Sequence, residues 1–173
     1  MVLIGIGSNR GDSIRIVQAS IAALTRFAAR DFRASSLWRT SPVDCPPDSP
    51  DYINAAVGFL PRPELTPEVL LQELKVLERE FGRVDVSTRN APRELDLDLL
   101  VFGTERRSTP AFTLPHPRAA MRRFVLAPVA EIAPDLRWPD TLASTCELLA
   151  ALQSDERVER LCAVADNPVS IPR

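Results

Sequence analysis

The sequence is poor in lysine, histidine and glycine. Of its 21 lysines and arginines only Lys75 is a lysine, so the other twenty are arginines, and His116 is the one histidine. A P-loop needs a lysine directly after a glycine-rich turn, and Lys75 stands in the segment Glu-Leu-Lys-Val without such a turn. The single histidine also excludes a zinc site built on several histidines. Any nucleotide chemistry of this chain is therefore not that of a P-loop enzyme.

Other absences bear on the location and the partners of the protein. No apolar run approaches the ~20 residues that a membrane span needs, and the first residues lack the basic and long apolar regions of a secretory signal. The three cysteines are odd in number and widely spaced, which fits neither a disulfide framework nor a metal site. A net charge of -2 gives no overall attraction to nucleic acid or to an anionic membrane. We therefore expect a cytoplasmic protein with no nucleic-acid or membrane partner.

The sequence does contain enough apolar material for one folded domain. It has 173 residues, of which 45% are hydrophobic and 25% are charged, as is typical of a globular protein. This length suits one core and would be short for two. We expect a single domain over residues 1–173, in which residues 154–173 form a polar C-terminal tail of uncertain structure.

The spacing of apolar residues predicts an alternation of strands and helices. Strands are expected at residues 2–7, 32–40, 52–60 and 95–102, with a short one considered at 112–114. Helices are expected at residues 13–29, 66–81, 123–132 and 144–152. Residues 41–50 hold four prolines and predict a long irregular loop. The order β-α-β-β-α-β matches the ferredoxin-like split β-α-β arrangement, so we expect an α+β fold with a mainly antiparallel sheet and additional helices, in three α/β/α layers.

The segment Leu-Asp-Leu-Asp-Leu-Leu at residues 95–100 is the most informative for chemistry. Side chains of a strand alternate between its two faces, so the leucines would be buried and Asp96 and Asp98 would stand side by side on the other face. Two close carboxylates repel each other unless a cation lies between them, and Mg²⁺ is bound in this way together with substrate phosphates. The alternative is the solvated face of an antiparallel strand, and the two aspartates alone leave both interpretations open.

Basic residues surround this segment. Arg93 precedes the strand and Arg83 follows the expected helix stop at Gly82, where each could form a weak surface ion pair or donate to phosphate. His116 lies between two prolines, and a structural role is as plausible as a functional one. The glycines at the end of the first strand do not form a dinucleotide fingerprint, because one residue too many precedes Gly11 and no parallel β-α-β unit follows. We assign them to strand exit and helix entry.

Several ordered motifs together resemble the 6-hydroxymethyl-7,8-dihydropterin pyrophosphokinase family of folate biosynthesis. Residues 89–100 (RNAPRELDLDLL) fit its signature, a basic residue followed by x-[GA]-P-R-x-x-D-[LIV]-D-[LIVM]-[LIVM]. Further matching stretches are IGIGSNRGD at 4–12, SLWRTSPV at 36–43, PDYINAAV at 50–57, EREFGR at 78–83, LPHPR at 114–118 and RRFVLAP at 122–128. The resemblance extends from residue 4 to about residue 139.

The resemblance implies a role for individual residues. Asp96 and Asp98 would bind two Mg²⁺ ions, and Arg83 and Arg93 would act on the transferring group. Either the metal platform would lower the pKa of the attacking hydroxyl or Asp98 would accept its proton. The ATP-contacting positions would be Lys75, Glu78, Arg93, Leu99, Thr113, His116 and Arg122. The pterin would be contacted by Thr40, Val43, Tyr52, Asn54 and Phe124.

The implied reaction transfers the terminal diphosphate of ATP to the pterin hydroxymethyl group and releases AMP, and we expect a monomer. The chain departs from the family where Asn90 replaces a frequent tryptophan and Glu94 adds a charge beside a phosphate site, which bears on loop closure or ATP affinity. Three alternatives are another Mg-dependent phosphoryl or nucleotidyl transferase, a ferredoxin-like module that binds RNA or a small ligand without catalysis, and a catalytically decayed homologue. Retention of Asp96, Asp98 and the basic residues argues against decay.

Overall fold

The computed structural model describes residues 1–43, 45, 48–82 and 92–162. Its centre is an antiparallel sheet around the apolar strand β1 (Val2–Ser8), which pairs with β4 (Tyr52–Pro61) on one side and β5 (Asp96–Phe102) on the other. Strand β4 also pairs with β3 (Leu37–Thr40) and with β2 (Ala28–Ala34), and β8 (Val158–Cys162) forms the edge beyond β3. The expected α+β fold with a mainly antiparallel sheet is confirmed.

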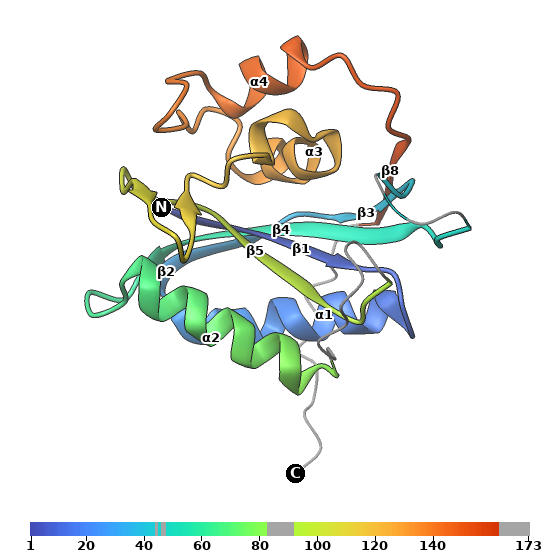
Figure 1. The fold of residues 1–173 in the computed structure, drawn as a ribbon, viewed down its shortest axis with the longest axis horizontal. Coiled ribbons are helices and arrows are strands. Elements are labelled where there is room, and N and C mark those ends of the chain that lie inside the picture. The colour runs from blue at the N-terminus through green and yellow to red at the C-terminus, as the bar shows by residue number, and fades with distance from the viewer. Residues whose placement is uncertain (44, 46–47, 83–91, 163–173) are drawn as a thin grey trace.

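Helices cover both faces of this sheet (Figure 1). Helices α1 (Ser13–Leu24) and α2 (Pro67–Glu80) lie on one face, and α3 (Arg123–Ile132) with α4 (Thr145–Ala151) lies on the other. Each face has its own apolar core. The α1/α2 core includes Leu95, Leu97 and Leu99, whereas Leu3 and Leu100 belong to the α3/α4 core. The expected three layers are therefore present.

Local signals in the sequence start the helices where they were expected. Asp12 accepts a hydrogen bond from the Arg15 amide at 3.2 Å at the start of α1. Thr66 accepts from the Val69 amide at 3.3 Å at the start of α2, which has a proline in its first turn. Helix α4 begins with a capping box between Ser144 and Glu147. No helix in the described part of the chain is long and apolar enough to cross a membrane.

Two expected elements were wrong in their bounds. The helix expected over residues 13–29 ends at Leu24, a short 3-10 turn follows at Thr25–Phe27, and residues 28 and 29 already belong to β2. The strand expected over residues 32–40 is two strands, separated at Ser35 and Ser36. The Ser35 hydroxyl accepts from the Ala56 amide at 2.9 Å, and the Ser36 amide donates to Glu131 of α3 at 3.0 Å. The Ser35 amide still donates to the Ala56 carbonyl at 2.9 Å, so the side-chain bonds add to the backbone contact where the strand is interrupted.

Two further segments have more order than the sequence predicted. The region 103–118 contains a two-stranded ribbon, β6 (Arg107–Ser108) with β7 (Thr113–Leu114). The polar tail contributes β8, in which Val158 pairs with Thr40 and Arg160 pairs with Trp38. An edge strand needs little apolar alternation, because only one of its edges and one of its faces must be covered. This is why the composition of the tail gave no strand signal.

Candidate active site

A pocket of about 260 Å³ opens on the α3 face of the sheet, at the end where β1 ends and β5 begins. Asp96 and Asp98 of β5 both project into it, and their side chains are 31% and 39% exposed. The intervening Leu97 points to the opposite face and is 5% exposed. The alternation of this segment thus gives one strand a core face and a carboxylate face, as the sequence predicted.

The floor of the pocket is made by glycines. Gly5 pairs with Asp98 and Gly7 pairs with Asp96 on one side, while on the other side Gly7 pairs with Asn54. A Cβ on Gly7 would lie 2.9 Å from Oδ1 of Asn54. A Cβ on Gly5 would instead meet only the Leu100 side chain, at 3.4 Å or more. The lack of a side chain at Gly7 therefore creates the space between the carboxylates and Asn54.

Strands β3 and β4 form a polar wall with an aromatic residue. Asn54 is 5% exposed and its Nδ2 donates to the Thr40 hydroxyl at 2.7 Å, which fixes the orientation of the amide. Val43 and Cys45 line the same wall, and Sγ of Cys45 lies 3.9 Å from the Tyr52 hydroxyl. Burial and the neighbouring Cys45 raise the pKa of Tyr52 to about 12, so the phenol stays neutral near pH 7.

The opposite wall comes from the start of α3 and the loop before it. Phe124 and Val125 present apolar surface, and the Arg122 guanidinium lies 5.3 Å from the centre of the Phe124 ring. Arg118 and His116 complete this wall. A partly exposed aromatic ring facing a fixed amide across a pocket suits a flat ligand with hydrogen-bonding edges.

Arg93 is held at the mouth of the site by its backbone and by its side chain. Its amide donates to Oδ1 of Asn9 at 2.9 Å, and its carbonyl accepts from the Asn9 amide at 3.2 Å. The guanidinium donates to Oδ1 of Asp96 at 3.0 Å. Burial is the largest single influence and lowers the pKa of Arg93, but the charge of Asp96, its hydrogen bond and the smaller contributions of Tyr52 and Glu78 together raise that pKa above its ordinary value. Arg93 therefore remains a cation next to the carboxylate pair.

His116 faces the second carboxylate. Its Nδ1 accepts from the Arg118 amide at 3.3 Å, which assigns the proton of the neutral ring to Nε2, 4.0 Å from Oδ1 of Asp98. Burial lowers the pKa of His116 although the charge of Asp98 opposes the shift. Burial, and next the charge of Asp96, raise the pKa of Asp98. The site therefore disfavours having both carboxylates ionised with no cation between them. The neutral His116 ring places an N–H donor beside them.

The donor set fits one kind of metal better than others. No group of three or more histidine, cysteine, aspartate or glutamate side chains in the described residues could enclose an ion. Two adjacent carboxylates with open space in front of them instead suit Mg²⁺, which keeps water ligands and takes phosphate oxygens from a substrate. Burial is the largest cause of the raised pKa of Asp98 and the charge of Asp96 adds to it, so a cation between the carboxylates would relieve the second contribution.

Most of the residues singled out from the sequence meet in this pocket. Ten of them line it: Thr40, Val43, Tyr52, Asn54, Arg93, Asp96, Asp98, His116, Arg122 and Phe124. Four others are not among its lining residues, namely Lys75, Glu78, Leu99 and Thr113. Arg83, Asn90 and the loop around them lie outside the described residues.

The four residues outside the pocket have identifiable positions. Lys75 is exposed on α2, and Leu99 is 5% exposed in the α1/α2 core. Glu78 is 6% exposed, and its Oε1 accepts from the Leu97 amide at 2.8 Å, so it supports β5 from the helix side. Glu94 does not reach the aspartate face, because β5 begins at Asp96, and it pairs instead with Arg10 at 3.2 Å.

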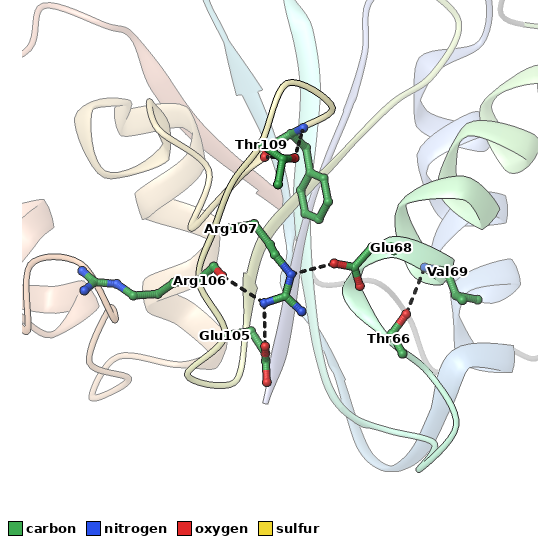
Figure 2. A network of polar contacts seen from close by, with 8 residues as sticks. Thr66, Glu68, Val69, Glu105, Arg106, Arg107 and Thr109 are labelled. Atoms are coloured by element: carbon green, nitrogen blue, oxygen red, sulfur yellow. Dashed lines mark hydrogen bonds and ion pairs between the residues drawn. The ribbon is translucent and has the colours of Figure 1, made fainter.

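Thr113 lies on the β6–β7 ribbon, which an arginine ties to α2 (Figure 2). Arg107 Nε donates to Glu68 at 2.6 Å, and its Nη1 donates to Glu105 at 2.7 Å. The ribbon leads directly into His116, whose amide donates to the Leu100 carbonyl of β5 at 2.9 Å. Arg107 therefore holds the segment that delivers His116 to the carboxylates.

Sequence reasoning missed part of the pocket. Its other lining residues are Gly5, Ile6, Gly7, Ser41, Cys45, Ala55, Arg118 and Val125. The assignment of the glycines to strand exit and helix entry is wrong for Gly5 and Gly7, which lie within β1. Their spacing of two within an apolar strand was the available signal, because it places both on one face.

An antiparallel α+β fold with two carboxylates, several arginines and an aromatic wall in one pocket has the features of a phosphate-transferring enzyme. The chain belongs to the 7,8-dihydro-6-hydroxymethylpterin-pyrophosphokinase family, whose model matches residues 3–134. This confirms the resemblance seen in the motifs.

Curated relatives agree with the family match. A 2-amino-4-hydroxy-6-hydroxymethyldihydropteridine pyrophosphokinase of Synechocystis sp. is 41% identical over 138 residues, 80% of this chain and 68% of the relative. One of the same name from Pseudomonas aeruginosa is 38% identical over 161 residues, 92% of this chain and 96% of the relative. A mitochondrial folate synthesis bifunctional protein of Arabidopsis thaliana is 37% identical over 142 residues, 82% of this chain but only 25% of the relative.

Proposed function

We propose that the pocket on the α3 face is where this chain carries out the reaction of its family. In that reaction the terminal diphosphate of ATP is transferred to 6-hydroxymethyl-7,8-dihydropterin, and AMP is released, within folate biosynthesis. One observation carries this assignment: a single pocket with a floor of glycines holds Asp96 and Asp98 together with Asn54 on one wall and Phe124 on the opposite wall. A phosphate-binding half and a flat-ring-binding half are thereby brought together.

The carboxylates would hold magnesium. Asp96 and Asp98 supply the hard oxygen ligands, and with ATP phosphates they would hold two ions, which supply charge neutralisation for the transferring group. In the structure described here the guanidinium of Arg93 is the cation on Asp96. Magnesium held by the carboxylates would supply the positive charge instead, and Arg93 would then donate to the transferring phosphates.

The remaining cationic groups would position ATP. Arg122 and Arg118 lie on the pocket wall, and the Nε2–H of His116 can donate to a phosphate oxygen. Arg83 stays a predicted catalytic arginine outside the described residues. Lys75, Leu99 and Thr113 stay predicted ATP contacts, and Glu78 stays one too, although its observed bond to Leu97 supports β5 from the other face.

The pterin would lie between the two walls. The Asn54 amide, oriented by Thr40, would bond to the hydrogen-bonding edge of the ring, and Phe124 would stack on its face. Tyr52 and Val43 would complete the contacts. This arrangement would bring the hydroxymethyl oxygen toward the β-phosphorus, and such positioning supplies a large part of the rate enhancement.

The hydroxymethyl oxygen must lose its proton during the attack. Asp98, whose carboxylate projects into the pocket, is one proposed acceptor. In the alternative route, Mg²⁺ held by the two carboxylates would lower the pKa of the hydroxymethyl group itself. Tyr52 is a poor candidate for a base because its pKa is raised to about 12.

Product identity tests the proposal. Incubation with Mg-ATP and hydroxymethyl-dihydropterin should give AMP and the pterin diphosphate, both identified by mass spectrometry. Addition of EDTA should stop the reaction. ADP as the product would indicate another phosphoryl transferase, and AMP release that does not depend on the pterin would overturn the assignment.

The binding-module alternative is not favoured. The chain belongs to an enzyme family, and the pocket on its sheet carries two aspartates, which repel nucleic-acid phosphates. Binding of RNA without Mg²⁺, weakening strongly with salt, would revive that alternative. A monomer in the cytoplasm remains our prediction, and size-exclusion chromatography with light scattering tests the first part.

A further inference from the structure

The C-terminal segment beyond the family match returns to the pocket. The family model ends at residue 134, whereas β8 pairs with β3 and places Val158 opposite Thr40, a residue of the pocket wall. The two residues before β8, Glu156 and Arg157, therefore arrive at the rim of the pocket. The sequence had assigned no role to this polar stretch.

Glu156 contacts the first turn of α3. Its Oε2 accepts from the Phe124 amide at 3.0 Å. The first amides of a helix need acceptors from outside the helix, and in the described residues the N-cap position, Arg122, makes no capping bond with its side chain. A carboxylate is the favoured partner at this end of a helix. Glu156 thus supplies from a distance of 32 residues the cap that α3 does not supply itself.

Arg157 contacts the opposite wall. Its amide donates to the Ser41 hydroxyl at 3.2 Å, and its carbonyl accepts from the Ser41 amide at 3.0 Å. Its guanidinium donates to Asp51, the residue before β4, at 2.6 Å. Ser41 lines the pocket and follows Thr40. Two consecutive residues of the segment therefore bind the two walls that we assign to the pterin.

The segment has a second anchor that does not involve the pocket. Glu131, near the C-terminal end of α3, accepts from the Ser36 amide at 3.0 Å, from the Trp38 indole at 3.2 Å and from Arg160 of β8 at 2.8 Å. Together with the ladder to β3, this network holds β8 when the contact at Glu156 is removed. Loss of Glu156 should therefore act on the first turn of α3 and not on the fold.

We propose that Glu156 is a positioning residue for the pterin: it fixes the turn that carries Phe124, while Arg157 holds the segment on the opposite wall. The proposal rests on the proposed function, in which Phe124 stacks on the pterin. If this turn is already ordered before the pterin binds, binding loses less conformational entropy. The affinity for the pterin therefore rises more than the affinity for ATP.

The test compares Glu156→Ala with Glu156→Gln and with Glu159→Ala, an exposed glutamate of β8. Removing a helix cap changes the equilibrium constant for ordering that helix end by about fivefold. For Glu156→Ala we expect the Kd of hydroxymethyl-dihydropterin, measured without ATP, and its KM to rise by about that factor, while the KM of ATP stays within about twofold. Hydrogen exchange of the Phe124 amide should accelerate similarly. Glu156→Gln, whose amide oxygen can accept the bond, and Glu159→Ala should resemble the wild type.

Three results would overturn the proposal. These are an unchanged pterin affinity in Glu156→Ala, an equal loss for pterin and ATP, and a failure of Glu156→Gln to restore the affinity. Arg157→Ala serves as a second variant, with an effect of about twofold on the pterin, because an exposed ion pair contributes little and its backbone bonds to Ser41 remain. If the wild type forms no pterin diphosphate from Mg-ATP and the pterin, the proposed function fails, and exchange of the Phe124 amide still decides whether Glu156 holds the turn.

Discussion

The two faces of β5 use alternate residues of one short segment for opposite purposes. Leu95, Leu97 and Leu99 are between 0% and 5% exposed and pack against α1 and α2. Asp96 and Asp98 face the other way, into the pocket. Burial of the leucines stabilises the strand, while the aspartates bring two repelling charges to a partly buried position. The comparison shows that the core face holds the strand in place so that the other face can carry charges unfavourable to folding.

The largest expected difference between the two faces of β5 comes from removing the carboxylates. Asp96→Ala and Asp98→Ala should each lower kcat by about a thousandfold or more, because the metal platform and the charge stabilisation at the transferring group are lost. Stability without metal should be unchanged or increased, since burial and Asp96 already raise the pKa of Asp98.

Asp96→Asn and Asp98→Asn serve as isosteric controls and should be nearly as inactive. Product formation and thermal unfolding in EDTA are the two measurements. Near-normal turnover by either alanine variant would contradict the metal assignment.

On the core face of β5, a mutation should lower the stability of the protein and leave kcat nearly unchanged. Leu97→Ala truncates a side chain that is 5% exposed in the core, and such a change destabilises a protein by about 2–5 kcal/mol. Once corrected for the folded fraction, kcat at low temperature should remain within a few-fold of the wild type. Urea unfolding and single-turnover rates give the two quantities. A large loss of kcat with little loss of stability would mean that the faces are not separate in function.

The same comparison shows which features the sequence could predict. The alternation of Asp96 with its neighbouring leucines is local, and so are the caps at Asp12 and Thr66, and these predictions were confirmed. The break at Ser35 depends on a bond to Ala56, 21 residues away, and no local pattern encodes it. Of the candidate site, the aspartate pair, Arg93 and His116 were found from the local pattern, and the aromatic residues were found through the family motifs.

The parts that sequence reasoning missed depend on tertiary neighbours. The floor at Gly7 is defined by the Asn54 side chain that a Cβ would meet. The role of Glu156 is defined by an amide of α3. Neither partner is near in sequence, so composition and periodicity do not indicate it.

A smaller effect is expected where the floor is changed and the carboxylates are kept. Gly7→Ala places a Cβ 2.9 Å from Oδ1 of Asn54 and must displace the amide that we assign to the pterin edge. We expect the KM for the pterin to rise about tenfold, the cost of one misplaced hydrogen bond to the substrate.

The matched control is Gly5→Ala. Its Cβ would meet only the flexible end of Leu100, at 3.4 Å or more, so it should disturb the pterin less. Pterin KM values measured at saturating ATP compare the two variants. If both variants raise the pterin KM equally, displacement of the Asn54 amide is not the cause of the effect.

The smallest effect is expected far from both faces, at the ion pair that ties the β6–β7 ribbon to α2 (Figure 2). The hydrogen bond from Arg107 is the largest cause that lowers the pKa of Glu68. A lowered pKa means that the contribution of the pair is present above the ordinary pKa of the carboxyl and is lost as the pH falls through the lowered value. In Arg107→Ala the pKa of Glu68 should rise toward its ordinary value, as an NMR titration of the carboxyl carbon would show. Because the pair is exposed, the KM for ATP should change by no more than about twofold. A tenfold change would mean that this ion pair is needed to hold the ribbon, with its predicted ATP contact Thr113, in the ATP site.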